Sequence, residues 1–191
     1  PLRPGLLVPL VGMALSGSVL AAEIGNWVEE LFPLPEVLRD ILLSLLRADT
    51  WIGFIWRAAL LALMAPVTEE LMFRGVFQHG LVANYGPVKG ICAASVCFGA
   101  FHLIPWQVMG ATLIGLLLGT VVHRTGSILA GMVVHAVWNF LPLFVVSVLR
   151  DISLPGYSPT SGTVTHIPFP VILTAAAVFA LTFRGFWRGT A

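Results

Sequence analysis

Long apolar stretches alternate with short polar connections along most of this chain. A helix needs roughly 20 apolar residues to cross a bilayer. Stretches of about that length occur near residues 5–22, 55–80, 87–105, 108–122, 127–149 and 168–183. The pattern predicts an all-α fold, namely a polytopic membrane helix bundle with about six transmembrane helices.

The segment between the first two stretches, residues 23–50, is much more polar and holds six acidic residues and two arginines. From about residue 36, beyond Pro33 and Pro35, its apolar residues recur at helical intervals. This spacing predicts an interfacial amphipathic helix. A helix packed against the rim of the bundle fits the same pattern equally well.

The composition agrees with a membrane protein whose surface meets the lipid bilayer. Hydrophobic residues fill 58% of the 191 positions and charged residues only 10%, whereas a soluble domain carries about twice that charged fraction. A net charge of +1 offers no basic surface, so we expect no nucleic acid partner. Cys92 and Cys97 lie five positions apart and cannot face each other on a helix, so we expect packing residues and no disulfide.

The lysines and arginines of the connections predict an orientation, because such residues collect on the cytoplasmic side of a membrane. Both termini are then cytoplasmic, and residues 23–50 and 150–167 lie outside. We expect a single domain over residues 1–191, with a motif-bearing core at about 55–150, in a multi-pass protein of the plasma membrane. The residues assigned to the cytoplasmic side are Arg3, Arg74, Lys89, Arg124, Arg184 and Arg188.

Three groups of residues stand out inside the apolar stretches, where ionisable side chains are costly and usually functional. A helix rises 1.5 Å per residue, and this rise puts Glu69, His102 and His135 at a similar depth near the middle of the membrane. The three groups are Glu69, Glu70 and Arg74, then Phe98 and His102, then His135 and Asn139.

Helical geometry assigns different roles to the two adjacent glutamates. Residues four apart share a face, so Glu70 and Arg74 can form an ion pair that neutralises a buried charge. Glu69 lies about 100° away around the helix and is left to face a neighbouring helix. Three helices can therefore deliver a free carboxylate, two imidazoles and an amide into one cavity.

This set supplies the groups that amide hydrolysis requires, which are a base for water, an acid for the leaving nitrogen and donors for the oxyanion. Glu69, assisted by His102, would activate the water, and His135 and Asn139 would donate to the oxyanion. A zinc site formed by Glu69, His102 and His135 is an alternative. Asn139 favours the metal-free scheme, since an amide is a poor zinc ligand.

These motifs resemble those of the CAAX proteases and bacteriocin-processing enzymes, the CPBP intramembrane endopeptidases, which include the type II CAAX prenyl endopeptidases. The family pattern is Glu-Glu-x-x-x-Arg, Phe-x-x-x-His and His-x-x-x-Asn. Every defining position is filled, and the resemblance covers about residues 55–150. The matching segments are Glu69-Glu70-Leu71-Met72-Phe73-Arg74, Phe98-Gly99-Ala100-Phe101-His102 and His135-Ala136-Val137-Trp138-Asn139.

The resemblance implies an all-helical peptidase with its site inside the membrane and no obligatory cofactor, since the family is now regarded as glutamate-dependent although long listed with metalloproteases. It implies catalytic roles for Glu69, His102, His135 and Asn139. The implied partner is a protein or peptide substrate. Relatives clip prenylated CAAX proteins or act in peptide maturation and bacteriocin immunity, and the reaction transfers to this chain more safely than the substrate.

Several of these residues also have a structural interpretation. An ion pair of Glu70 and Arg74 stabilises a fold whatever the chemistry, and Phe98 suits packing, so we assign these three residues a supporting role. The other residues weighed here are His79, His123 and His166, expected near loop ends, Trp106, expected as an interface anchor, and the stripe Ala111, Gly115 and Gly119, expected to pack within the bundle.

Two functions other than proteolysis remain open from the sequence. A non-catalytic transport or immunity protein could use the buried polar groups to move protons or bind a partner. A small membrane cytochrome could ligate haem through His102 and His135. Neither alternative accounts for Glu69 and Asn139 together.

Overall fold

The computed structural model describes residues 2–157 and 164–190, and in these residues the regular elements are all helices. Several of them join end to end, most notably over residues 51–85. The elements are a 3-10 turn η1 (Pro4–Leu6), α1 (Leu7–Leu31), α2 (Glu36–Leu46), α3 (Trp51–Arg57), a π-helical segment η2 (Ala58–Met64), α4 (Ala65–Glu70), a second π-helical segment η3 (Leu71–Gln78), α5 (His79–Tyr85), α6 (Pro87–Phe101), α7 (Pro105–Thr125), α8 (Ile128–Val148) and α9 (Phe169–Gly189).

The predicted membrane helix bundle is confirmed. Among the described residues, five helices are long and apolar enough to cross a membrane, and they include the continuous 35-residue helix Trp51–Tyr85. The remaining apolar helix, α6, has 15 residues and ends at Phe101 instead of continuing to about residue 105 as expected. At 1.5 Å per residue it is roughly 22 Å long, short of the roughly 30 Å of a hydrocarbon core.

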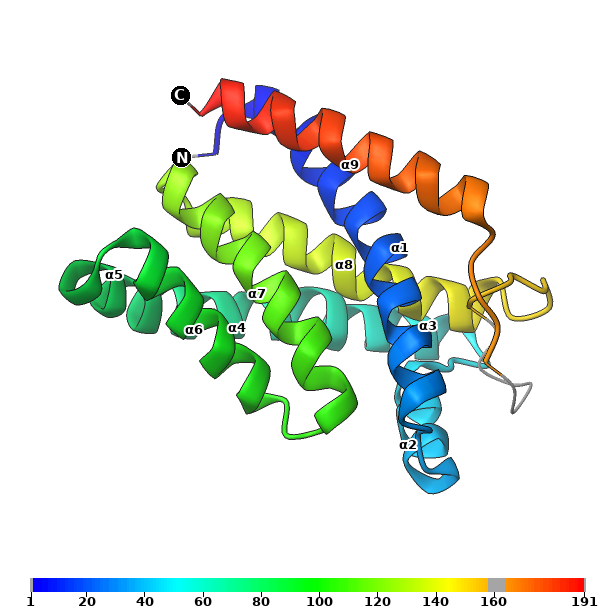
Figure 1. Cartoon of the computed structure of the whole chain (residues 1–191). Coiled ribbons are helices and arrows are strands. Elements are labelled where there is room, and N and C mark those ends of the chain that lie inside the picture. Colours follow the sequence, from blue (N-terminus) through cyan, green and yellow to red (C-terminus); the bar gives the residue numbers. More distant parts are fainter. Residues whose placement is uncertain (1, 158–163, 191) are drawn as a thin grey trace.

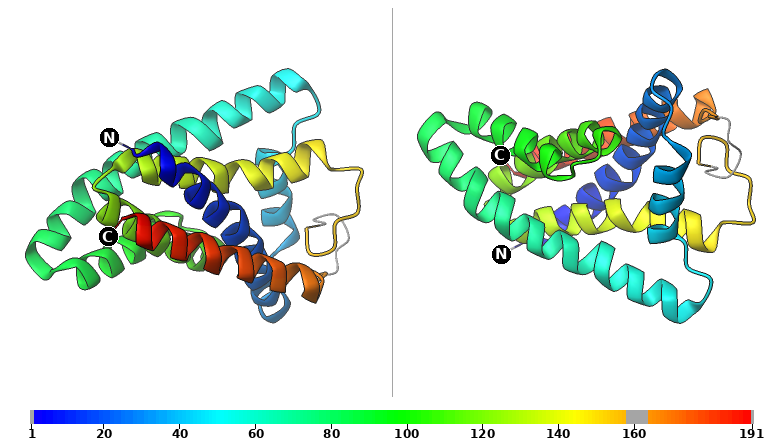
Figure 2. Two further views of the ribbon diagram at one scale, coloured as in Figure 1. Left: turned by 90° about the horizontal axis from the view of Figure 1, so that it is seen from above. Right: turned by 90° about the horizontal axis from the view of Figure 1, so that it is seen from below.

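Both termini lie at the same end of the bundle (Figure 1). There Arg3 donates a hydrogen bond to the Gly189 carbonyl, and the Arg124 guanidinium lies 3.6 Å from the centre of the Trp187 ring. Helices α1 and α9 pack against each other, as the left view of Figure 2 shows. This agrees with the predicted placement of both termini on one side of the membrane, and which side that is stays a prediction.

Arg74 does not belong among the loop charges used to predict the orientation. It is 4% exposed, and it pairs with Glu70 inside the bundle. Its side chain therefore gives no information on which connection faces the cytoplasm.

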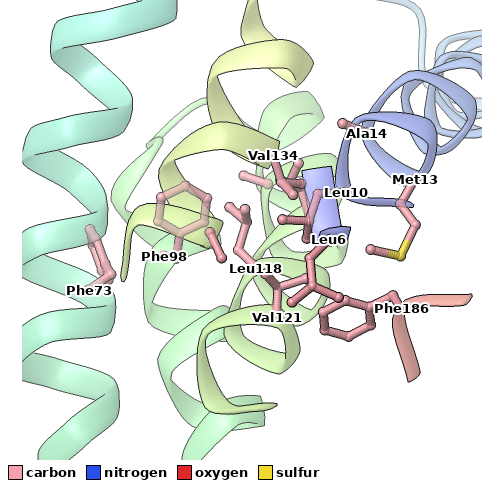
Figure 3. Packing of buried hydrophobic residues seen from close by; sticks show 13 residues of the cluster. Leu6, Leu10, Met13, Ala14, Phe73, Phe98, Leu118, Val121, Val134 and Phe186 are labelled. Atoms are coloured by element: carbon pink, nitrogen blue, oxygen red, sulfur yellow. The ribbon is translucent and has the colours of Figure 1, made fainter. Parts of the chain in front are cut away.

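The core lies where α1, α6, α7, α8 and the long helix meet. Figure 3 shows Phe73 and Phe98 facing each other on one side, and Leu118, Val121 and Phe186 gathered around α1 on the other. The apolar side chains that point outward cost little in lipid, because lipid tails are as apolar as they are. Cys92 and Cys97 are free and both exposed on α6, so the expected packing role of these two residues is wrong.

Helix α2 forms at the predicted place and has no buried residue. Its exposed apolar residues Val37, Ile41 and Leu45 follow one another at four-residue spacing, which puts them on one face. Arg57 donates to the carbonyls of Ser44 and Leu45 at the end of α2, where helix carbonyls lack backbone donors. The helix thus keeps an apolar face free for the lipid interface while Arg57 fixes its end.

Close contacts between helices depend on glycines at three crossings. A Cβ atom on Gly119 of α7 would lie 2.6 Å from Gln78 Oε1, and one on Gly115 would lie 3.1 Å from the Ser95 side chain. The small-residue stripe on α7 therefore packs within the bundle, as predicted. A Cβ on Gly90 of α6 would lie 2.6 Å from the backbone of Val82 in α5, so these two helices approach backbone to backbone.

The connection between α8 and α9 is tied to α1 through Glu23. Its carboxylate accepts a hydrogen bond from the Ile167 backbone N–H at 2.9 Å and lies 2.8 Å from His166 Nδ1. The His166 Nε2 atom lies 3.4 Å from Glu30. His166 therefore lies outside the spanning helices, as expected, and it holds the connection in place as part of an ion pair.

We expect Gly90→Ala to destabilise the protein by about 1–3 kcal/mol, because the added methyl group meets backbone atoms that cannot rotate away. Gly80→Ala on α5 is the matched control. A Cβ there meets nothing within 4 Å, and alanine is the better helix former by roughly 0.5–1 kcal/mol. Thermal unfolding in detergent measures both variants, and equal melting temperatures would contradict the backbone contact.

We expect the tether of His166 to Glu23 to weaken at high pH. The hydrogen bond with Glu23 raises the pKa of His166 above its usual value, with Glu30 adding to the effect. A raised folded-state pKa gives stability that is complete below the unfolded pKa of about 6.5 and is lost as pH rises through the folded pKa. The difference in melting temperature between wild type and His166→Gln should be larger at pH 6 than at pH 9. A difference that stays constant over this range would contradict a charged tether.

Candidate active site

The predicted ion pair between Glu70 and Arg74 forms in the interior of the bundle. Arg74 Nη1 lies 2.9 Å from Glu70 Oε1, and the two side chains are 1% and 0% exposed. This contact is an ion pair at an angle that does not make a hydrogen bond. Arg74 Nη2 donates to the Gly115 carbonyl of α7 at 3.1 Å. The guanidinium is thus fixed from two helices.

Gln78 repeats this contact one turn further along the same helix. Its Nε2 donates to the Gly119 carbonyl at 3.0 Å, and its side chain is 4% exposed. The missing side chain of Gly119 lets Gln78 come this close to the α7 backbone. Gln78 lies four residues after Arg74 in an apolar stretch, and this spacing is the one sequence signal for it. Its role in fixing the long helix against α7 is not predicted by the sequence.

His135 lies between the two glutamates. Its Nδ1 is 3.0 Å from Glu70 Oε1, and its Nε2 is 3.7 Å from Glu69 Oε2. Only 2% of His135 is exposed. The first distance is a hydrogen bond and the second is too long for one, so His135 is held by Glu70 and faces Glu69.

Glu69 has the free carboxylate that helical geometry predicts. Its side chain is 23% exposed while that of Glu70 is fully buried. Among the described residues, Glu69 Oε2 is buried without a hydrogen-bond partner. A buried carboxylate oxygen in this state is costly and needs a donor such as a water molecule.

His102 ends helix α6 and joins the cluster through Phe98. Its Nδ1 lies 3.0 Å from the Phe98 carbonyl. A carbonyl only accepts hydrogen bonds, so Nδ1 carries the proton and Nε2 is available for chemistry. Leu103, the next residue, has a φ of 58°, a left-handed backbone conformation that residues other than glycine rarely adopt. The chain turns sharply there towards α7.

The Phe98 ring lies against three side chains of this cluster. Its centre lies 4.4 Å from the Arg74 guanidinium, 5.0 Å from the His102 ring and 5.7 Å from the His135 ring. Phe98 is 1% exposed. The expected packing role is therefore right, and the residues that it packs against are the charged and imidazole side chains of the candidate site.

Asn139 follows His135 by one turn of α8 and contacts the long helix. Its Nδ2 donates to the Leu61 carbonyl at 3.0 Å. The Ala65 N–H donates to the Leu60 carbonyl. The next residue, Pro66, has no N–H to donate, so the Leu61 carbonyl is left without the backbone donor that would follow in this helix. Asn139 supplies that donor and keeps a second amide hydrogen for other partners.

The zinc alternative does not fit this arrangement. Within residues 2–157 and 164–190, no group of three or more His, Cys, Asp or Glu side chains is placed to hold a metal ion. Both ring nitrogens of His135 face carboxylates, and the Phe98 ring lies against both imidazoles.

The segment that carries these motifs matches a known protein family. Residues 50–141 match the model of the Rce1-like type II CAAX prenyl endopeptidases. The match spans slightly less than half of the chain. The resemblance expected from the three motifs is confirmed, and so is the class of CAAX-type intramembrane peptidases at the level of the family. The search of curated proteins found no match, and neither did the search of solved structures.

This match supports a protein or peptide substrate and a membrane environment. It covers α3 to most of α8, which holds the whole cluster described above. Helices α1, α2 and α9 lie outside the matched segment, and α1 packs against α7 and α8 on the side away from the long helix. The matched segment thus contains the candidate site, and the remaining helices complete the packing of the bundle.

We expect Arg74→Met to destabilise the protein by about 3–5 kcal/mol, because it leaves the Glu70 carboxylate buried without a cation. The double variant Glu70→Gln/Arg74→Met should recover much of this loss. Arg184→Met, on an exposed position of α9, is the control and should stay within about 0.5 kcal/mol of wild type. Unfolding in detergent measures all three, and equal losses in the single and double variants would contradict a buried pair.

Proposed function

We propose that this protein is an endopeptidase that hydrolyses peptide bonds within the membrane by means of a water molecule activated by Glu69. The observation that carries the proposal is the different state of the two adjacent glutamates. Glu70 is neutralised by Arg74 at 2.9 Å, whereas Glu69 is partly exposed and has an unused oxygen. A carboxylate in that position can accept a proton during a reaction.

The tautomer of His135 supports a water site beside Glu69. The Glu70 carboxylate can only accept, so in the neutral imidazole Nδ1 carries the proton and Nε2 is an acceptor. Nε2 and Glu69 Oε2 are then two acceptors 3.7 Å apart, and a water molecule can donate one hydrogen bond to each. The same water would have its oxygen lone pairs free to attack a carbonyl carbon.

In the proposed reaction, Glu69, assisted by the free Nε2 of His102, takes a proton from this water. The water oxygen adds to the carbonyl carbon of the scissile bond, and the carbonyl oxygen becomes an oxyanion. A proton passed on to His135 Nε2 makes that nitrogen a donor to the oxyanion, together with the second amide hydrogen of Asn139. The C–N bond breaks as the proton moves to the leaving nitrogen.

The family match supports the choice of substrate class. We propose a CAAX-type prenylated protein or a peptide that is matured by cleavage, presented at the level of Glu69 inside the bilayer. We also propose that this chain is a multi-pass protein of the plasma membrane with both termini, which lie at one end of the bundle, on the cytoplasmic side. Residues 1–191 are proposed to form a single protease domain.

We expect Glu69→Gln to lower turnover by about 10²–10⁴-fold, because an amide cannot accept the proton of the water. His102→Ala should lower it as well, while Glu36→Gln, an exposed change on α2, should not. The measurement compares the protein and peptide termini of membranes from cells that carry each variant. Identical termini in the wild-type, Glu69→Gln and His102→Ala samples would argue against proteolysis.

A further inference from the structure

Gly131 lies on α8 one turn before His135, and no motif of the chain includes it. A Cβ atom at this position would lie 2.6 Å from Glu70 Oε2 and 2.7 Å from the Val122 side chain. Contacts under 3.0 Å are closer than real Cβ atoms tolerate. The carboxylate of Glu70 therefore occupies space that any other amino acid at position 131 would fill.

The Glu70 carboxylate cannot move aside easily. Its Oε1 is fixed between Arg74 Nη1 at 2.9 Å and His135 Nδ1 at 3.0 Å. Its Oε2 points at Gly131 and, among the described residues, has no hydrogen-bond partner. A methyl group at position 131 would therefore displace the carboxylate from one or both of its partners.

The same carboxylate determines which nitrogen of His135 faces Glu69. Gly131 and His135 are four residues apart and lie on one face of α8. Glu70 packs into the gap left by Gly131 and accepts the Nδ1 proton of His135 from there. The free Nε2 of His135 is thereby directed at Glu69 Oε2, beside the water site of the proposed reaction.

We propose that Gly131 is a positioning residue for the peptidase reaction, because its missing side chain seats the Glu70 carboxylate and, through it, fixes the tautomer and direction of His135. The inference rests on the proposed function. Gly131 touches neither substrate nor water in this scheme, and it acts through Glu70 alone. The position is therefore expected to affect turnover far more than substrate binding.

The test compares Gly131→Ala with Gly110→Ala on α7, where a Cβ meets nothing within 4 Å. Both proteins are labelled with ¹⁵N-histidine and reconstituted in lipid nanodiscs. The His135 signal is assigned by its loss in His135→Gln, and the ¹⁵N shifts report which ring nitrogen carries the proton. Wild type and Gly110→Ala should show a protonated Nδ1 at His135, and Gly131→Ala should lose this uniform state.

Turnover gives a second and separate readout. On the cleavage products that distinguish wild type from Glu69→Gln, Gly131→Ala should lower kcat at least 10-fold with little change in KM, and Gly110→Ala should change neither. Adding Glu70→Asp to Gly131→Ala shortens the crowded side chain, so the double variant should lose less than the sum of the two single losses expressed as free energies.

A Gly131→Ala protein with the wild-type His135 spectrum and wild-type kcat would overturn the inference. So would equal losses in the Gly131→Ala and Gly110→Ala proteins. Failure of the proposed function looks different, because Glu69→Gln would then leave the products unchanged while the ¹⁵N spectra still report on His135. If Gly131→Ala does not fold, the Gly131→Ala/Glu70→Asp protein provides the spectrum, and a double variant that also fails to fold, while Glu70→Asp alone folds, would count against the contact.

Discussion

The structure depends on one buried ion pair in a medium that cannot solvate it. Glu70 and Arg74 are almost fully enclosed, and charges removed from water must be neutralised at close range. The rest of the site follows from this requirement. The Arg74 guanidinium donates to a carbonyl of α7, and the Glu70 carboxylate accepts from the imidazole of α8. A single charged pair on the long helix therefore fixes the position of two neighbouring helices.

Glycines make this geometry possible because the polar groups bond to helix backbones or lie directly against them. Gly119 lets Gln78 reach an α7 carbonyl, Gly115 makes room for Ser95 of α6, and Gly131 admits the Glu70 carboxylate. In a membrane such close approach also provides much of the packing energy between helices, since lipid offers no hydrophobic driving force. The same small residues thus serve both the bundle and the proposed chemistry.

The sequence predicts the helical bundle, the ion pair and the separation of the two glutamates, because apolar stretch length and four-residue spacing are local properties. It does not predict that both nitrogens of His135 face carboxylates, since that depends on how α8 is rotated against the long helix. Nor does it predict the contact of Asn139 with Leu61, which arises from a carbonyl that Pro66 leaves without a donor. The length of α6 was overestimated because Leu103, Ile104 and Pro105 continue its apolar pattern beyond the turn at Leu103.

The early end of α6 has a consequence for His102. A helix of about 22 Å that starts at one surface ends within the hydrocarbon layer, where carbonyls without donors are costly. The His102 side chain supplies one donor by bonding the Phe98 carbonyl through Nδ1. The need to cap a helix end in an apolar medium therefore fixes the tautomer of the neutral imidazole, with the proton on Nδ1. The Nε2 atom is then free to accept a proton at the end of α6, where the backbone is no longer helical. Non-helical backbone at this depth is tolerated where it lines water, and water is the substance that the proposed reaction consumes.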